Sequence, residues 1–229
     1  MAGSAAADTK AYRYHNRRFE RALPGMDLLL DAFAVVDCGV AQAIAHRGQT
    51  PACGPNCYQC CIQPIPVTPL EILGLRMFVR PEFAPDHMKG HVAGHESNHR
   101  VGHASGITPE VRMALTAGFA SFTGEAVSLG ATCPFLHEHR CAVYPVRPMA
   151  CRRFIVYETP CAKNEDPTRT RPHQVLQPGQ DFLQAALRHT LPWYRERYPL
   201  PAMPSAAEVQ AFFRSVTIIL QAVPWAKRV

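Results

Sequence analysis

The stretch Cys53-Gly-Pro-Asn-Cys57-Tyr-Gln-Cys60-Cys61 places four thiols within nine residues, and the rest of the sequence is best understood as built around it. A second group follows much later in the chain and consists of Cys133, Cys141, Cys151 and Cys161. Thiolates are soft ligands that bind zinc or iron tightly, and two dense groups of cysteines are hard to explain by packing alone. The two groups together predict a metal-binding protein.

The spacing inside the first group suits more than one metal arrangement. In Cys57-x2-Cys60, both sulfurs can point at one ion while the intervening amide N–H groups face the sulfurs. Cys60 and Cys61 are adjacent and project differently, so we do not expect both to bind one mononuclear ion in a relaxed geometry. A second metal ion or a polynuclear cluster is therefore an open alternative.

The second group must be brought together by the fold. Seven residues separate Cys133 from Cys141, and nine separate Cys141 from Cys151, which is too long for a zinc-knuckle turn. Each of these cysteines is therefore expected on its own piece of loop. Pro145 and Pro148 stiffen those pieces and lower the entropy cost of ordering the ligands.

Several side chains beside the second group have expected roles around it. Arg147 and Arg152 are expected to offset thiolate charge or to donate hydrogen bonds to sulfur. Arg153 is explained equally well as a surface residue. Tyr144 and Phe154 are expected to pack beside the site and shield it.

Composition favours a site rather than a disulfide scaffold. With 229 residues and 47% hydrophobic residues, the chain can bury a sizeable core without covalent staples. The formal net charge of +6 counts every thiol as neutral, so thiolate ligands would offset part of it. Apart from the N-terminal tail the basic residues are scattered rather than gathered into a stripe, so nucleic-acid binding is not expected.

The N-terminal half carries no clear targeting or membrane signal. Residues 1–22 are basic but lack the apolar stretch of a secretory signal. The closest candidate for a membrane span, residues 26–45, contains Asp27, Asp31 and Asp37, which would be costly in lipid. We therefore expect no membrane association and a cytoplasmic location, where thiols stay reduced and clustered cysteines favour metal over disulfides.

Apolar residues at helical spacing and local capping signals predict a mainly α fold. Thr68 and Glu71 form a capping signal before one helix, and Ser205 and Glu208 form another. Cys38 lies inside the first apolar segment and is expected to fill the core as a small hydrophobe. The expected helices cover residues 26–46, 69–79, 108–129, 179–198 and 205–220. The predicted fold is a single helical domain with irregular, Cys-rich metal-binding loops.

The expected organisation has three parts. Residues 1–25 form an N-terminal tail, residues 26–165 form the cysteine-cluster metal-binding domain, and residues 166–229 form a C-terminal helical segment that packs on it. Within the domain, residues 87–103 contain a histidine every four positions: His87, His91, His95, His99 and His103. Adjacent pairs on a helix could chelate a transition metal, but interspersed glycines weaken a helix there. We expect a polar connector, with a secondary or metal-delivery site as the alternative.

The order of the motifs resembles the YkgJ-type cysteine-cluster family, which is described as zinc- or iron-chelating. The matching motifs are Cys53-x3-Cys57-x2-Cys60-Cys61, Val67-Thr68-x2-Glu71, Cys133-Pro-Phe-Leu136 and Cys141-x2-Tyr144-x2-Arg147-Pro148-x2-Cys151-Arg152-x-Phe154. The resemblance implies that the shared metal-binding residues are Cys53, Cys57, Cys60, Cys61, Cys133, Cys141 and Cys151, with Cys161 as an eighth. It implies zinc or iron as the cofactor but no reaction.

Three classes of function remain as hypotheses. The first is a cytosolic metal-binding protein whose zinc or iron–sulfur centre is structural or serves transfer or sensing; its expected partner is the metal ion, and any protein partner is unknown. The second is an iron–sulfur or other metal-dependent enzyme, because Cys53-x3-Cys57-x2-Cys60 has radical-SAM spacing and a flagellin lysine-N-methylase bears similar clusters. Gln59 stands where the radical-SAM motif usually has an aromatic residue, and the strand–helix alternation of a partial barrel is missing. The third is an adaptor built on zinc loops.

Two histidines near the second group are alternative ligands. His137 and His139 lie between Cys133 and Cys141, and either could replace a cysteine around zinc. The same residues could form a Cys–His nucleophile pair, although the cysteines are better explained as ligands. The sequence thus leaves the ligand set open at this point of the chain.

Overall fold

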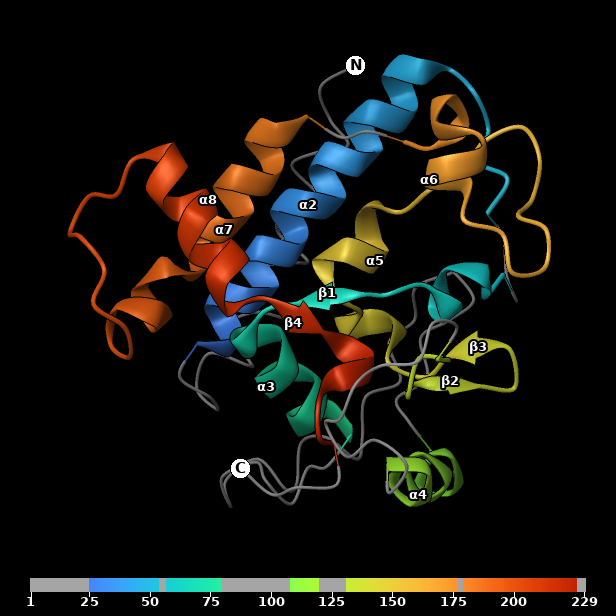
Figure 1. Ribbon diagram of the computed structural model, residues 1–229, viewed down its shortest axis with the longest axis horizontal. Helices are drawn as coiled ribbons and strands as arrows, with labels where there is room; N and C mark the ends of the chain where they lie inside the picture. The colour runs from blue at the N-terminus through green and yellow to red at the C-terminus, as the bar shows by residue number, and fades with distance from the viewer. Residues whose placement is uncertain (1–24, 54–56, 80–107, 120–130, 177–178, 226–229) are drawn as a thin grey trace, which may run out of the picture.

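The computed structural model describes residues 25–53, 57–79, 108–119, 131–176 and 179–225, and it is mainly helical, as predicted (Figure 1). The predicted N-terminal tail lies almost entirely outside the described residues, and the five histidines of 87–103 lie wholly outside them. Both interpretations, like the predicted domain boundaries, therefore stay predictions.

The long helix α2 (Met26–Arg47) is the central element, and it matches the helix predicted over 26–46. It packs against α3 (Pro69–Val79), α5 (Met149–Arg153) and α7 (Gln180–Arg195). The packing on α7 is close, because a Cβ built on Gly39 would lie 2.4 Å from the ring of Phe182. The apolar face of α2 is thus the surface against which these three helices pack.

By length and composition alone, α2 is also long and apolar enough to cross a membrane. The core helix of a globular protein passes the same test, and the buried residues of α2 face its helical neighbours. The finding gives weak support to a membrane span, and the absence of membrane association stays a prediction.

The helix α8 (Ala206–Val216) begins at a complete capping box, as predicted. Ser205 Oγ accepts a hydrogen bond from the Glu208 amide, and the Glu208 carboxylate accepts one from the Ser205 amide at 2.7 Å. The prediction that this helix continues to residue 220 is wrong. Ile218–Ile219 forms β4, which pairs antiparallel with β1 (Pro66–Val67), because β-branched residues favour extended backbone once a partner strand is present.

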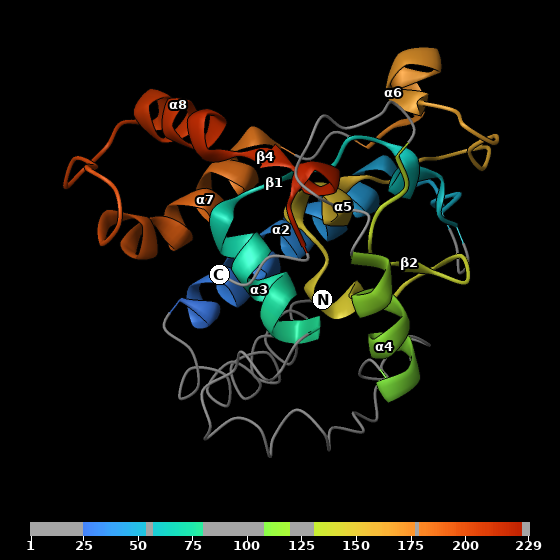
Figure 2. The same cartoon turned by 60° about the horizontal axis from the view of Figure 1, so that its bottom comes forward.

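The remaining elements are short. The helix α4 (Pro109–Gly118) begins at the predicted cap Thr108, but residues 120–129 of the predicted helix lie outside the described residues. A hairpin of β2 (Leu136–His137) and β3 (Arg140–Cys141) lies beside α4 in both views (Figure 1; Figure 2). The segments α6 (Pro167–Thr170) and η6 (Pro172–Gln174) follow the last cysteine.

An aromatic cluster supports the hairpin from below. The ring of Phe135, one residue before β2, meets Trp225 and Phe119 edge to face, with centroids 4.8 Å and 5.7 Å away. Edge-to-face contacts between buried rings add to the stabilisation from burial. The loops that carry Cys133 and Cys141 thus stand on a packed apolar base.

Candidate metal centre

The two cysteine segments meet at the short 3-10 helix η1 (Gln59–Ile62), which carries Cys60 and Cys61. The Cys133 amide donates a hydrogen bond to the Cys61 carbonyl at 2.7 Å. A tight turn fixes the cysteine pair, since the Gln63 amide bonds the Cys60 carbonyl at 3.2 Å. Two segments far apart in sequence are therefore joined through their backbones at their cysteines.

The hairpin that follows makes a second link between the segments. Its two turn residues, Glu138 and His139, have φ values of 46° and 62°, as a two-residue hairpin turn that matches the twist of the strands requires. The His139 ring stacks on Tyr58 of the first segment with centroids 4.5 Å apart. Cys141 follows on β3, so the hairpin holds its thiol beside η1.

Cys151 is positioned by a buried carboxylate. Glu71 is only 2% exposed, and one of its oxygens accepts the hydrogen bond from the Met149 amide at the start of α5 at 2.7 Å. The other accepts the amide and hydroxyl hydrogen bonds of Thr68, both at 2.8 Å. Burial raises the pKa of Glu71, while these donors and Arg152 oppose the shift. The predicted cap of α3 is therefore confirmed, and it also fixes the helix that carries Cys151.

The buried side chain of Arg152 links the loop before α5 to helix α2. Its guanidinium donates to the carbonyls of Arg147 and Pro145 at 2.9 Å and 2.5 Å and pairs with Asp37 of α2 at 2.6 Å. It also lies over the ring of Phe33, 4.0 Å from the centroid. Burial raises the pKa of the Cys141 thiol, and the charges of Arg147 and Arg152 oppose this shift, so the charge contribution predicted for Arg152 is present. Most of its bonds, however, hold backbone in place.

Five thiols form what we call the inner group: Cys60, Cys61, Cys133, Cys141 and Cys151. The pKa of Cys60 is raised, first by interaction with the Cys61 thiol and then by burial. Interaction with the Cys133 thiol has the largest effect on Cys61 and raises its pKa. Burial raises the pKa of Cys151 well above its usual value, and the thiols of Cys60, Cys141 and Cys61 add to the shift. Each of the five side chains is therefore close enough to at least one other member of the group to interact with it.

Three thiols form the outer group: Cys53, Cys57 and Cys161. Cys60 of the inner group also interacts with Cys53, so the two groups adjoin each other at this point. The Cys53 sulfur accepts a hydrogen bond from the Val156 amide at 3.3 Å, and the adjacent Ala52 amide bonds the Val156 carbonyl at 2.7 Å. Burial raises the pKa of Cys161 to about 11, with further contributions from Cys57 and Cys53. Cys57 is exposed, so the outer group reaches the protein surface.

The loop that carries Cys161 is held by an ion pair. Glu165 receives two bonds from the Arg171 guanidinium, at 2.8 Å and 3.1 Å, and one from the Ala162 amide at 2.7 Å. These bonds lower the pKa of Glu165 to about 2. The Glu165 carbonyl in turn accepts a hydrogen bond from Gln63 at 3.0 Å, which joins this loop to the end of η1. Sequence reasoning missed this pair, whose only signal is the closeness of both residues to Cys161.

Each group has one hydrogen-bond donor that is left without a partner among the described residues. The Nε atom of Arg147 is buried and unpaired, and Arg147 acts electrostatically on Cys60 and Cys141. The buried hydroxyl of Tyr157 is also unpaired and lies close enough to Cys53 for the two to interact. A thiolate is a strong acceptor for such donors, so the surroundings fit metal-bound sulfur.

The thiols lie in two groups, but neither group has the geometry of a metal-coordination site among the described residues. All nine cysteines lie in the described part of the chain and all are free. Across the described ranges, no three Cys, His, Asp or Glu side chains converge closely enough to hold a metal ion. Binding would therefore have to draw the sulfurs of a group closer together.

Two predictions about side chains near the site are wrong. Cys38 is exposed rather than buried, because Val36 and Val40 occupy the core face of α2 and Cys38 lies between them in sequence, on the other face. Tyr144 keeps 38% of its surface exposed and stacks with Arg147 at 3.9 Å, so it covers the arginine instead of sealing the site. Phe154 is half-buried.

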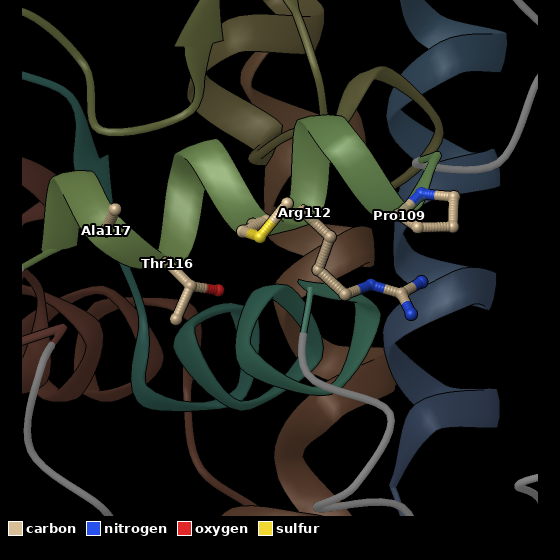
Figure 3. A pocket seen from close by; sticks show the side chains of 5 residues that line it. Pro109, Arg112, Thr116 and Ala117 are labelled. Carbon is tan, nitrogen blue, oxygen red and sulfur yellow. The ribbon is translucent and has the colours of Figure 1, made fainter.

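A surface pocket lies on α4. It is lined by Pro109, Arg112, Met113, Thr116 and Ala117. Figure 3 shows these side chains along one helix, and none of them is among the predicted metal ligands. The pocket therefore adds nothing to the metal centre.

Comparison with known proteins gives one match. The family described as "CxxCxxCC: putative zinc- or iron-chelating domain" matches residues 52–173, which is more than half of the chain and includes both cysteine groups. No curated protein and no solved structure matches the chain. The match agrees with the resemblance seen in the motifs and indicates a zinc- or iron-chelating function. The chain therefore belongs to the CxxCxxCC family of zinc- or iron-chelating domains.

Proposed function

We propose that this protein binds zinc or iron through the thiolates of the inner and outer groups. The proposed ligands are Cys53, Cys57, Cys60, Cys61, Cys133, Cys141, Cys151 and Cys161. Family membership supports the choice of metal. A bound ion would supply the positive charge that keeps the sulfurs deprotonated at neutral pH.

The contact between the two cysteine segments is the observation on which the proposal depends. The backbone bond from Cys133 to Cys61, and the interactions among thiols of both segments, bring together residues that the sequence leaves far apart. Metal ligands from separate loops can act together only if the fold first brings them close. The polar surroundings support the same function, because Arg147 and Tyr157 offer unpaired donors to thiolate sulfur.

An iron–sulfur centre is one form that the proposed site could take, since such clusters are held by cysteine thiolates. The enzymatic alternative has less support. In the part of the chain that the structure describes, the strands form two separate two-stranded sheets, whereas a radical-SAM-like barrel needs alternating strands and helices. We therefore propose metal binding and assign no reaction.

The proposed location is the cytoplasm. Nine free thiols, several of them close neighbours, persist best where the surroundings are reducing. A secreted chain with the same contacts would be expected to form disulfides.

The experiment is anaerobic purification of the full chain followed by metal analysis and an absorption spectrum. We expect zinc or iron in stoichiometric amount; visible absorption with bound iron would indicate an iron–sulfur centre, and a colourless protein with zinc a mononuclear one. The variant C60S/C61S should lose metal relative to C38S, which removes only an exposed thiol outside both groups. A wild-type protein that contains neither metal, and takes up neither after reduction, would rule out the proposal.

A further inference from the structure

The division of the thiols into two groups has a consequence beyond metal binding itself. We propose that the inner and outer groups are two separate metal sites, and that the outer site exchanges its ion readily with small thiol-containing chelators. The inference rests on the proposed function, because it assigns different tasks to the same ligands. Four sulfur ligands complete a tetrahedral zinc site, so eight thiols exceed the need of one ion.

Separate backbone contacts hold the two groups. Cys53 is fixed against the extended segment at Val156, which is itself paired with Val175 on its other side. The inner group is instead built on η1, the hairpin and α5, with the Cys133–Cys61 backbone bond at its centre. Sulfurs anchored to different pieces of backbone can close around different ions without competing for one position.

Each group also has its own polar support. The unpaired Arg147 Nε lies near Cys60 and Cys141, whereas the unpaired Tyr157 hydroxyl lies near Cys53. A buried donor without an acceptor costs free energy, and a thiolate would supply the missing acceptor in the metal-bound state. One such donor in each group is expected if each group becomes charged by binding its own ion.

The outer group has the features of an exchange site. It supplies three thiols, so a tetrahedral ion there keeps one position for a fourth ligand from outside. Cys57 is exposed, and an incoming thiol can reach the ion from that side. The inner group has five thiols, of which Cys133 is only 8% exposed, and this arrangement favours slow release.

Glu165 and Arg171 are positioning residues for the outer site. The pair locks the loop of Cys161 and touches no thiol of the inner group in any described contact. A positioning residue in the surroundings of a metal ligand typically changes affinity by about 10–100-fold. The variant E165Q is therefore expected to release the outer ion faster and to leave the inner ion unchanged.

The first test is a titration of metal-depleted full-length protein with Co²⁺ under anaerobic conditions, followed by sulfur-to-cobalt charge-transfer absorption. We expect two equivalents in the wild type, one in C161S, and one of the other spectral type in C151S. Removal of both equivalents, or of neither, by C161S would overturn the two-site inference, as would a single equivalent in the wild type. A wild type that binds no Co²⁺, and that contains neither zinc nor iron after anaerobic purification, would instead overturn the proposed function.

The second test needs no cysteine variant, so it holds even if C151S does not fold. Zinc-loaded wild type is mixed with a chromogenic chelator, and release is expected in two phases. In E165Q the fast phase should accelerate by about 10–100-fold while the slow phase is unchanged. The matched control is E196Q, which breaks an exposed pair with Arg197 after α7 and should leave both phases unchanged. Release in a single phase would contradict the inference.

Discussion

The helical frame and the cysteine loops are stabilised in different ways. In the frame, α2, α3 and α7 bury apolar side chains so closely that Gly39 and Gly74 leave no room for a methyl group. In the loops, a few polar side chains hold long stretches of backbone: Glu71, Arg152 and the Glu165–Arg171 pair. The frame should therefore determine whether the protein is folded, and the loop contacts should determine how well it binds metal.

The largest expected effect comes from the frame. Leu29 is 1% exposed on α2 and faces Gly74 of α3, where a built Cβ would lie 2.6 Å from its Cδ2 atom. L29A should lower the free energy of unfolding by about 2–5 kcal/mol, because it removes buried methyl groups and leaves a cavity. Urea denaturation measures the change, and the folded fraction should still bind metal at wild-type stoichiometry. Loss of metal by folded L29A would mean that frame and loops are not separable.

Arg152 joins the two regions, so its loss should affect both. R152M leaves the carbonyls of Arg147 and Pro145 without their donor, while the half-exposed Asp37 can turn to water. We expect a loss of about 1–3 kcal/mol in unfolding free energy together with weaker metal binding. Denaturation and Co²⁺ titration report the two effects. R153M, at the neighbouring arginine, should change the free energy of unfolding by less than about 0.5 kcal/mol. Equal losses of unfolding free energy in the two variants would contradict the role of Arg152 in holding the loop backbone.

Acid should act on the loops before it acts on the frame. The pKa of Glu165 is lowered to about 2 in the folded protein, so its ion pair stabilises the fold above the ordinary carboxylate pKa of 4.5. This contribution is lost as the pH falls from about 4.5 toward 2, because protonation then favours the unfolded chain. Denaturation curves over this range should show a smaller pH dependence for E165Q than for wild type. Identical pH profiles would mean that the pair does not hold the loop.

The smallest effect is expected at the ninth cysteine. Cys38 is exposed on α2, and its sulfur accepts one hydrogen bond from Gln42 at 3.4 Å. C38S should change the free energy of unfolding by less than about 0.5 kcal/mol and retain all bound metal. Metal analysis of the purified variant is sufficient to check this. Any loss of metal would mean that Cys38 on α2 takes part in metal binding, so that the site would not be confined to the cysteine loops.

Local signals in the sequence were sufficient wherever a contact is local. The capping boxes at Thr68 and Ser205 join residues three apart, so the starts of α3 and α8 could be predicted. The end of α8 could not, because residues 218–219 leave the helix to pair with residues 66–67, far earlier in the chain. Cys38 was predicted to fill the core because it lies inside an apolar segment, but it is two residues from both Val36 and Val40 and therefore lies on the opposite face of α2.

In the candidate site, too, the features that depend on nearby residues could be predicted, and those that depend on distant residues could not. The two cysteine groups are visible as spacing, but their meeting depends on contacts such as Cys133 to Cys61 that no local pattern encodes. Glu71 could be predicted as a cap, whereas its second bond, to Met149, requires that α5 lie across the start of α3. The Glu165–Arg171 pair could not be predicted, because charged residues six apart in a loop have no preferred geometry.

The pairing of β1 with β4 bears on where the chain can be cut. The segment matched by the family ends at residue 173, yet β1 finds its only partner strand in the described chain at residues 218–219, and α2 packs on α7. A polypeptide trimmed to the matched segment would lack both α2 and α7 and would expose an unpaired strand edge to its neighbours. Such a fragment should aggregate rather than fold. The segment matched by the family model, residues 52–173, is therefore shorter than the segment that can fold independently.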